Sequence, residues 1–208
     1  MARYTGAVCR LCRREGEKLF LKGARCNSPK CTLTKRAYAP GDHGQGRIKL
    51  SNYGVQLREK QKVKRMYGMM EGQFKRYFEQ AAKTKGVTGK VLLQQLERRL
   101  DNVIFRLGLA VSRAQARQVV RHNFVWVGET RVNIPSYQVS KDEMIKIKGS
   151  EKALNKLKEN LEAAKDRSVP TWLEFNPQEM TARVARLPEK EDIQATIKEQ
   201  LIVELYSK

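Results

Sequence analysis

Four cysteines near the N-terminus have the most definite chemistry of any residues in the sequence. They are the only cysteines of the 208-residue chain, and they form a C-x2-C pair, a gap of 13 residues and a C-x4-C pair. A C-x2-C turn lets two thiolates converge on one ion, and a second close pair completes a tetrahedral sulfur site. Zinc suits four thiolates that have no redox role. The spacing therefore predicts one zinc ion bound by Cys9, Cys12, Cys26 and Cys31.

Two other uses of these cysteines remain open, an iron–sulfur cluster and a pair of disulfides. The sequence shows no signal peptide and no apolar run long enough to span a bilayer, so we expect a soluble, intracellular protein, in which disulfides are disfavoured. Few apolar residues lie between Cys9 and Cys31, so burial of a core is a weak source of folding energy there. We expect metal coordination to drive folding of this segment, and metal removal to unfold it alone.

The second chemical feature is a large excess of basic side chains. The chain has 42 Lys and Arg against 22 Asp and Glu, a formal net charge of +20 and a pI near 10.0. The excess is spread over the first three quarters of the chain, whereas residues 161–208 carry more acidic than basic side chains. A membrane-binding protein would concentrate such charge on one amphipathic helix. Dispersed cations instead favour a large nucleic acid, because many separate phosphate contacts add together.

The third feature is a row of arginines at four-residue steps. Ser112 is a predicted N-cap, and Arg113, Arg117 and Arg121 follow it on one predicted helix. No acidic residue occurs between residues 102 and 128 to offset the repulsion between them. A solvated helix face is the alternative, but the pattern favours binding of a polyanion. On this interpretation Arg117→Glu should weaken RNA binding with little loss of stability.

Helices and a small sheet must position these side chains. Apolar periodicity predicts helices over 53–67, 71–83 and 88–107, a short helix from Ser112, and another from Ser150 that Pro170 ends. Alternation predicts strands over 124–127, 130–134 and 143–148, the first two joined by a turn at Gly128-Glu129. Glycines and a proline predict a linker over residues 39–46. The apolar end, 201–206, is expected to pack on the helices around residues 50–95. The fold class is α+β.

These segments also resemble a known family. The sequences LDNVIFRLG (100–108) and SRAQARQVVRH (112–122) resemble the RNA-binding domain named after small-subunit ribosomal protein S4. The likeness extends to YAPGDHG (38–44), to LREKQK (57–62) and to the closing QLIVELYS (200–207), so it covers nearly the whole chain. The four-cysteine pattern is similar to that of the metal-binding, bacterial-type members.

The resemblance implies a structural protein rather than an enzyme. Family members bind 16S rRNA early in assembly of the 30S body, contribute to translational accuracy, adjoin ribosomal protein S5 and lie near the mRNA where it enters the subunit. It implies a cytoplasmic protein within the ribosome, with no membrane and no small-molecule substrate. It also implies three parts: a zinc module and linker (1–45), a mainly helical domain (46–97 plus 170–208) and an inserted α/β RNA-binding domain (98–161). Asn123 and Gly128-Glu129 depart from the family pattern, but asparagine and glycine both accept a positive φ.

The expected RNA contacts are basic side chains in the N-terminal module, the linker, the first long helix and the arginine row. They are Arg3, Arg10, Arg13, Arg14, Lys22, Lys35, Arg36, His43, Arg47, Lys49, Arg58, Lys62, Arg65, Arg113, Arg117 and Arg121. Two other functions remain to be weighed. An RNA-modifying enzyme can carry the same domain, but the sequence has no phosphate-binding loop and no nucleophile–base set. A zinc-containing transcription factor would confine its charge to one groove-reading helix.

Overall fold

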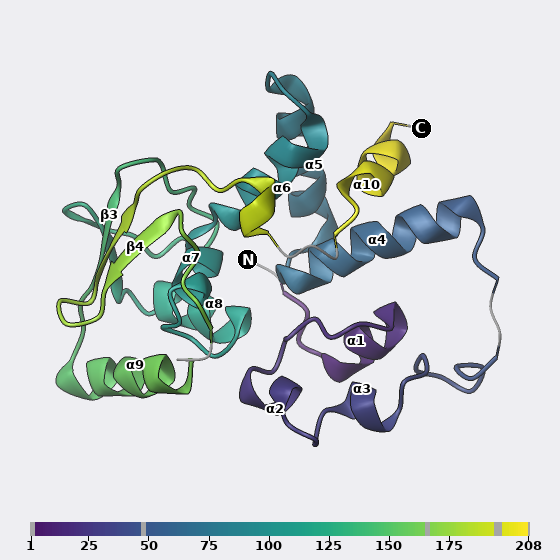
Figure 1. Cartoon of the computed structure of the whole chain (residues 1–208), viewed down its shortest axis with the longest axis horizontal. Coiled ribbons are helices and arrows are strands. Elements are labelled where there is room, and N and C mark those ends of the chain that lie inside the picture. Colours follow the sequence, from purple (N-terminus) through teal and green to yellow (C-terminus); the bar gives the residue numbers. More distant parts are fainter. Residues whose placement is uncertain (1–2, 47–48, 165–166, 194–196, 208) are drawn as a thin grey trace. The chain divides into compact units, whose positions relative to one another are not determined.

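The computed structural model describes residues 3–46, 49–164, 167–193 and 197–207 (Figure 1). Contacts divide the chain into two compact units, Met1–Leu92 with Ala195–Lys208, and Leu93–Gln194. The first unit contains α1 (Cys9–Glu15), α2 (Ala24–Asn27), α3 (Thr32–Lys35), α4 (Asn52–Met66), α5 (Glu71–Lys83) and α10 (Glu199–Tyr206). Helix α6 (Thr88–Glu97) begins in the first unit and ends in the second. Among the described residues, no helix combines the length and apolar character needed to cross a membrane.

The second unit contains a five-stranded antiparallel sheet and the helices that cover one of its faces. Its elements are α7 (Leu100–Arg106), α8 (Arg113–Arg121), β1 (Val125–Val127), β2 (Thr130–Arg131), β3 (Met144–Ile147), α9 (Glu151–Ala163), β4 (Leu173–Asn176), β5 (Thr181–Val184) and a 3-10 turn, η1 (Lys190–Asp192). The strand order is β2-β1-β3-β5-β4. Alternate strand residues such as Val125, Ile145 and Val184 are buried against α7, α8 and α9. The buried side chains of the strands and of these helices together form the core. The predicted α+β class is confirmed.

The C-terminal helix returns to the first unit, as its apolar composition predicts. Gln56 of α4 donates a hydrogen bond from Nε2 to Glu204 Oε2 at 2.9 Å. The ring of Tyr206 stacks on Phe78, with ring centroids 4.5 Å apart. The predicted packing of residues 201–206 on the helices around residues 50–95 is therefore confirmed.

Glu71 joins α4, α5 and α10 through one carboxylate. It accepts hydrogen bonds from Lys60 Nζ at 2.7 Å, Lys64 Nζ at 2.8 Å and Tyr206 Oη at 2.9 Å. Burial alone would raise the pKa of Glu71, but these three donors outweigh it and lower the pKa to about 2. Burial and the bond to Glu71 raise the pKa of Tyr206.

Glu71→Gln should remove part of the acid sensitivity of the first unit. Because the pKa of Glu71 is lowered in the folded state, its contribution is present above the unfolded value of 4.5 and is lost as pH falls through about 2. Its side chain is 46% exposed, so solvent screening limits the effect to roughly 1 kcal/mol. The free energy of unfolding, measured in urea between these pH values, should depend less steeply on pH in the variant than in the unaltered chain. Glu79→Gln, whose carboxylate is 54% exposed, should leave the slope unchanged, and equal slopes for both variants would contradict the prediction.

The predicted helix over 88–107 is wrong as a single element. Helix α6 ends at Glu97 and α7 begins at Leu100, because Arg99 adopts an extended conformation, with φ −62° and ψ 134°. The extended segment pairs with a loop, where Val139 N donates to Arg98 O at 3.0 Å and Leu100 N donates to Tyr137 O at 2.9 Å. Backbone hydrogen bonds to a distant segment thus override local helical periodicity.

The assignment of residues 170–208 to the helical domain is also wrong in part. Strands β4 and β5 extend the sheet through the pairing of β5 with β3, and they fall within the second unit. Their alternating burial follows the sheet period of two, with Ala182 and Val184 facing the core. The predicted strand 130–134 is shorter than expected, since β2 ends at Arg131. Asn123 and Gly128 do adopt positive φ, at 66° and 59°.

Candidate nucleic-acid interface

The four cysteines lie in one small module at the N-terminus. Cys9 and Cys12 belong to α1, Cys26 belongs to α2, and Cys31 immediately precedes α3. Cys12, Cys26 and Cys31 are buried, and all four are free of disulfides. Within the described part of the chain, no group of three or more His, Cys, Asp or Glu side chains lies close enough to hold a metal ion. The structure therefore does not assemble the predicted ligand set by itself.

Backbone N–H groups point at several of these sulfurs. Lys22 N donates to Cys26 Sγ at 3.3 Å. Burial raises the pKa of Cys12 in spite of a backbone hydrogen bond from Leu19, and the charges of the other three cysteines raise it further. Burial would also raise the pKa of Cys31, but backbone hydrogen bonds from the residues that follow it outweigh burial and lower that pKa. The module thus supplies backbone donors that stabilise the thiolate form of these cysteines.

Two arginines of α1 hold the predicted linker rather than pointing freely into solvent. Arg13 donates from Nε to Tyr38 O at 2.9 Å, and its guanidinium lies 4.9 Å from the centre of the Tyr38 ring. Arg14 donates from Nη2 to Pro40 O at 3.1 Å. These contacts tie the linker to the cysteine module, so the two arginines have a structural role besides their charge.

The cations of α4 predicted to contact RNA are paired with carboxylates. Arg58 and Arg65 both donate to Glu15, whose side chain is only 2% exposed. Lys62 Nζ lies 3.0 Å from Glu59 Oε1 and 3.5 Å from Glu17 Oε2. Burial raises the pKa of Glu15, although the arginine charges oppose this effect. The pairs connect α1 to α4 within the first unit, and they reduce the charge that these three cations can offer a ligand.

Two arginines of the predicted row are buried. Arg117 Nη1 lies 3.5 Å from Asp101 Oδ2, and Arg99 binds the same carboxylate through two hydrogen bonds of 3.0 Å and 2.7 Å. Arg113 donates from Nε to Asn102 Oδ1 at 2.8 Å. Arg113 and Arg117 are each only 8% exposed. The interpretation of Arg113, Arg117 and Arg121 as one exposed row is wrong, because the first two brace α8 against α7.

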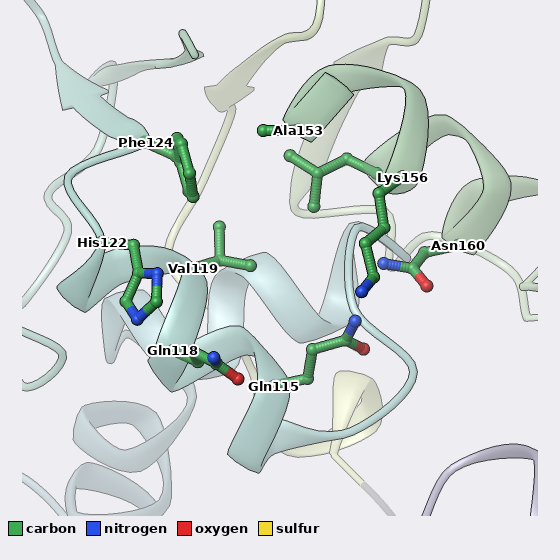
Figure 2. Close-up of a pocket in the computed structure, with 9 residues that line it drawn as sticks. Gln115, Gln118, Val119, His122, Phe124, Ala153, Lys156 and Asn160 are labelled. Atoms are coloured by element: carbon green, nitrogen blue, oxygen red, sulfur yellow. The ribbon is translucent and has the colours of Figure 1, made fainter. Parts of the chain in front are cut away.

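Arg121 differs from the other two because it is exposed. It is the last residue of α8, and a cavity of about 240 Å³ lies between α8 and α9. Both polar and apolar side chains line the cavity (Figure 2), and they are Gln115, Gln118, Val119, His122, Phe124, Ala153, Lys156, Leu157 and Asn160. Lys156 reaches from α9 toward Gln115 on α8 (Figure 2). Such a site can contact a planar polar group through amide, imidazole and ammonium donors.

The remaining predicted contacts are exposed side chains. Within the described ranges, no ion pair with a carboxylate involves Arg3, Arg10, Lys22, Lys35, Arg36, His43 or Lys49. Arg47 lies outside the described residues. The structure thus leaves most of the N-terminal cations available to a polyanion, while it binds those of α4 internally.

Gln118, His122 and Lys156 were missed by the sequence analysis. Helical periodicity could have identified Gln118 and His122, because it places them on the side of α8 opposite its buried residues. Lys156 had no local signal, because only the packing of α9 on α8 brings it to the cavity.

Two family profiles match consecutive parts of the chain. The profile described as "Ribosomal protein S4/S9 N-terminal domain" matches residues 3–97. The profile described as "S4 domain" matches residues 98–145.

Full-length relatives are also similar to the chain. Proteins of Acetivibrio thermocellus and Thermodesulfovibrio yellowstonii are each 59% identical to it over 208 residues, and one of Pelotomaculum thermopropionicum is 58% identical. In each case the match covers 100% of both chains. All three relatives are named "Small ribosomal subunit protein uS4".

Proposed function

Because the chain belongs to the family of small ribosomal subunit protein uS4, a family of structural rather than enzymatic components, we propose that it binds 16S rRNA as a constituent of the small subunit. As part of the ribosome it acts in the cytoplasm. The observation that carries the proposal is the set of exposed cations without a carboxylate partner, on a chain whose formal net charge is +20. Cations that are not neutralised within the fold are the ones that release counterions from RNA phosphates.

On the second unit, the RNA-binding surface is the exposed side of α8 and the cavity beside it. Arg121 supplies charge, while Gln118, His122 and Lys156 supply hydrogen-bond donors that can reach phosphate or a base edge. Arg113 and Arg117 serve this surface indirectly, since they fix α8 on α7.

In the first unit, the RNA contacts are the exposed basic residues of the cysteine module and of the segments that flank the linker. Arg10, Lys22 and Lys35 surround the cysteines on short helices and turns, so a rigid module would present them together. Arg3, Arg36, His43 and Lys49 extend this basic surface along the chain. Arg47 is retained as a proposed contact on its charge alone.

Zinc is proposed as the group that makes this module rigid. Cys9, Cys12, Cys26 and Cys31 would hold one ion, because four thiols in one module are a donor set suited to zinc. The Lys22 N–H that is donated to Cys26 Sγ supports the proposal, because such a donor stabilises a thiolate ligand. An iron–sulfur cluster is the alternative for the same ligands. The ion would supply folding energy and no redox step.

The finer roles are proposed by analogy with the family. They are early binding that nucleates assembly of the 30S body, a contribution to translational accuracy, contact with ribosomal protein S5 and proximity to the incoming mRNA. The division into residues 1–45, 46–97 and 98–161 is proposed likewise, with residues 170–193 now grouped with the RNA-binding unit.

Arg121→Glu should weaken binding to a 16S rRNA fragment by about tenfold in moderate salt, because it reverses one exposed phosphate contact. The slope of log K against log salt should also become shallower by roughly one unit. Filter binding over a salt series measures both quantities, with duplex DNA as a competitor that should displace the RNA poorly.

The matched control is Lys158→Glu, an exposed cation on α9 that does not line the cavity. It makes the same charge change in the same unit and should reduce affinity far less. If both variants lost affinity equally, binding would depend on net charge alone and the α8 surface would have no special role. If duplex DNA competed as well as rRNA, the proposed RNA function would be wrong.

A further inference from the structure

The outer face of the five-stranded sheet carries a tryptophan surrounded by cations. Trp126 is paired in register with Lys146 on one side and with Arg131 on the other. Paired residues of an antiparallel sheet point to the same face, so the three side chains form one row across β2, β1 and β3. The residues on either side of this row in β3, Ile145 and Ile147, face the core, which leaves the row on the opposite face.

Lys148 completes this cluster. Its Nζ lies 4.5 Å from the centre of the Trp126 ring, a cation–π contact. Trp126 is only partly buried, whereas the chain's other tryptophan, Trp172, is 0% exposed. Trp126 is thus partly exposed, and the lysine that contacts its ring is itself exposed, so a ligand can replace that lysine without disturbing the core.

The charge of the cluster is not offset within the part of the chain that the structure describes. Arg131, Lys146 and Lys148 make no ion pair with a carboxylate there. At the other end of the sheet the situation is reversed, because Arg183 is paired with Asp142 at 2.7 Å. The uncompensated charge is therefore confined to the strands around Trp126.

We propose that Trp126, Arg131, Lys146 and Lys148 form a second RNA site, which binds a single-stranded segment by stacking one base on the indole and holding the flanking phosphates with the three cations. The site extends the proposed rRNA-binding function to the opposite side of the same unit and rests on that function. Neighbouring strands lie about 5 Å apart, so Arg131 and Lys146 flank the ring closely on its two sides. Base–aromatic stacking is stronger than an exposed cation–π contact, so an arriving base displaces Lys148, which then becomes available to a phosphate.

Single-stranded RNA fits these residues better than duplex RNA or an acidic protein segment. In a duplex the bases are stacked on each other and have no free face for the indole. An acidic peptide would satisfy the cations but would leave the aromatic ring without a planar partner. An aromatic platform with flanking cations is the pattern that single strands use.

Tryptophan fluorescence tests the proposal on the full-length, metal-loaded chain. The probe is a single-stranded ribo-oligonucleotide of roughly eight nucleotides, compared with its duplex and with a glutamate-rich peptide of equal charge. We expect the single strand to quench Trp126, and Trp126→Phe to lose the quenching but keep most of the affinity. Trp126→Ala should bind about tenfold more weakly. If the alanine variant loses affinity for the single strand while the phenylalanine variant keeps it, an aromatic ring is required at this position, as stacking predicts.

Two controls make the result decisive. Lys148→Gln should reduce affinity for the oligonucleotide several-fold, while Arg183→Gln, on the same face but already paired with Asp142, should not. An unchanged affinity in Trp126→Ala would overturn the proposal, and so would equal, Trp126-dependent binding of the duplex or the peptide. Each variant is also assayed with the structured 16S rRNA fragment. If the fragment binds but the single strand does not, this inference alone fails; if the fragment does not bind, the proposed function fails.

Discussion

Replacing Asp101 with asparagine should lower the free energy of unfolding of the second unit by about 3–5 kcal/mol, because it leaves two buried guanidinium groups without their shared negative charge. The Arg99 side chain is 1% exposed and the Asp101 side chain 7%. Burial removes the hydration of a guanidinium group, and the Asp101 carboxylate supplies negative charge that offsets this cost. Urea unfolding followed by tryptophan fluorescence reports on this unit, since both tryptophans belong to it.

Asp142→Asn is the matched control for this prediction. Asp142 pairs with Arg183 at the same 2.7 Å distance and in the same unit, but the two side chains are 55% and 52% exposed. The loss there should stay below about 1 kcal/mol, because solvent screens an exposed pair. Equal losses in the two variants would show that burial of the Asp101 cluster has no energetic consequence.

The same cluster changes the expectation for Arg117→Glu. A glutamate at this position would face Asp101 in a buried site, so the variant should be strongly destabilised rather than folded and merely deficient in RNA binding. The burial of Arg117 thus contradicts the expectation from sequence that this variant loses little stability. Arg121 is the residue of the row at which RNA binding can be changed without disturbing the core.

Removal of the proposed zinc ion should unfold residues 3–46 and leave the second unit folded. Structural zinc contributes about 10–16 kcal/mol in isolated finger peptides, far more than the small apolar content of this module can replace. Limited proteolysis after chelation should cleave within the cysteine module, while tryptophan fluorescence should be unchanged because both tryptophans lie in the second unit. Metal analysis should find one zinc ion per chain.

Single substitutions separate metal binding from ordinary turn chemistry. Cys26→Ser should reproduce the effect of chelation. Ser28→Ala should not, although it removes a side chain that bonds both Arg25 O and Lys30 N in the same turn. A module that resists proteolysis equally with and without metal would contradict the zinc proposal, and bound iron in place of zinc would favour the iron–sulfur alternative.

Arginines that are paired within the fold and arginines that are exposed have different roles in the proposed function. Those that contact carboxylates or carbonyl oxygens within the fold, such as Arg13, Arg99 and Arg117, stabilise the protein's own structure. Exposed ones such as Arg121 remain for the RNA. A net charge of +20 thus overstates the charge that a ligand meets at any one surface.

Local sequence determined the features that depend on neighbouring residues. The N-cap at Ser112 is present, with its hydroxyl accepting from Gln115 N, because capping involves only the first helical turn. The alternation of β3 and the positive φ at Gly128 follow from strand period and turn chemistry. The cysteine spacing and the family motifs could be recognised for the same reason, since they are patterns within short segments of the chain.

Tertiary structure decided which side chains are available. A four-residue step advances about 400° around an α-helix, so a row at that spacing drifts by about 40° at each step. Arg113 and Arg117 therefore lie toward the buried side of α8 and only Arg121 reaches solvent, yet the drift alone does not reveal that Asp101 and Asn102 receive them. The break at Arg99 and the joining of β5 to β3 likewise depend on backbone groups distant in sequence. Local patterns fix which conformations a segment favours, whereas the partners of a charged or backbone group are set by the rest of the fold.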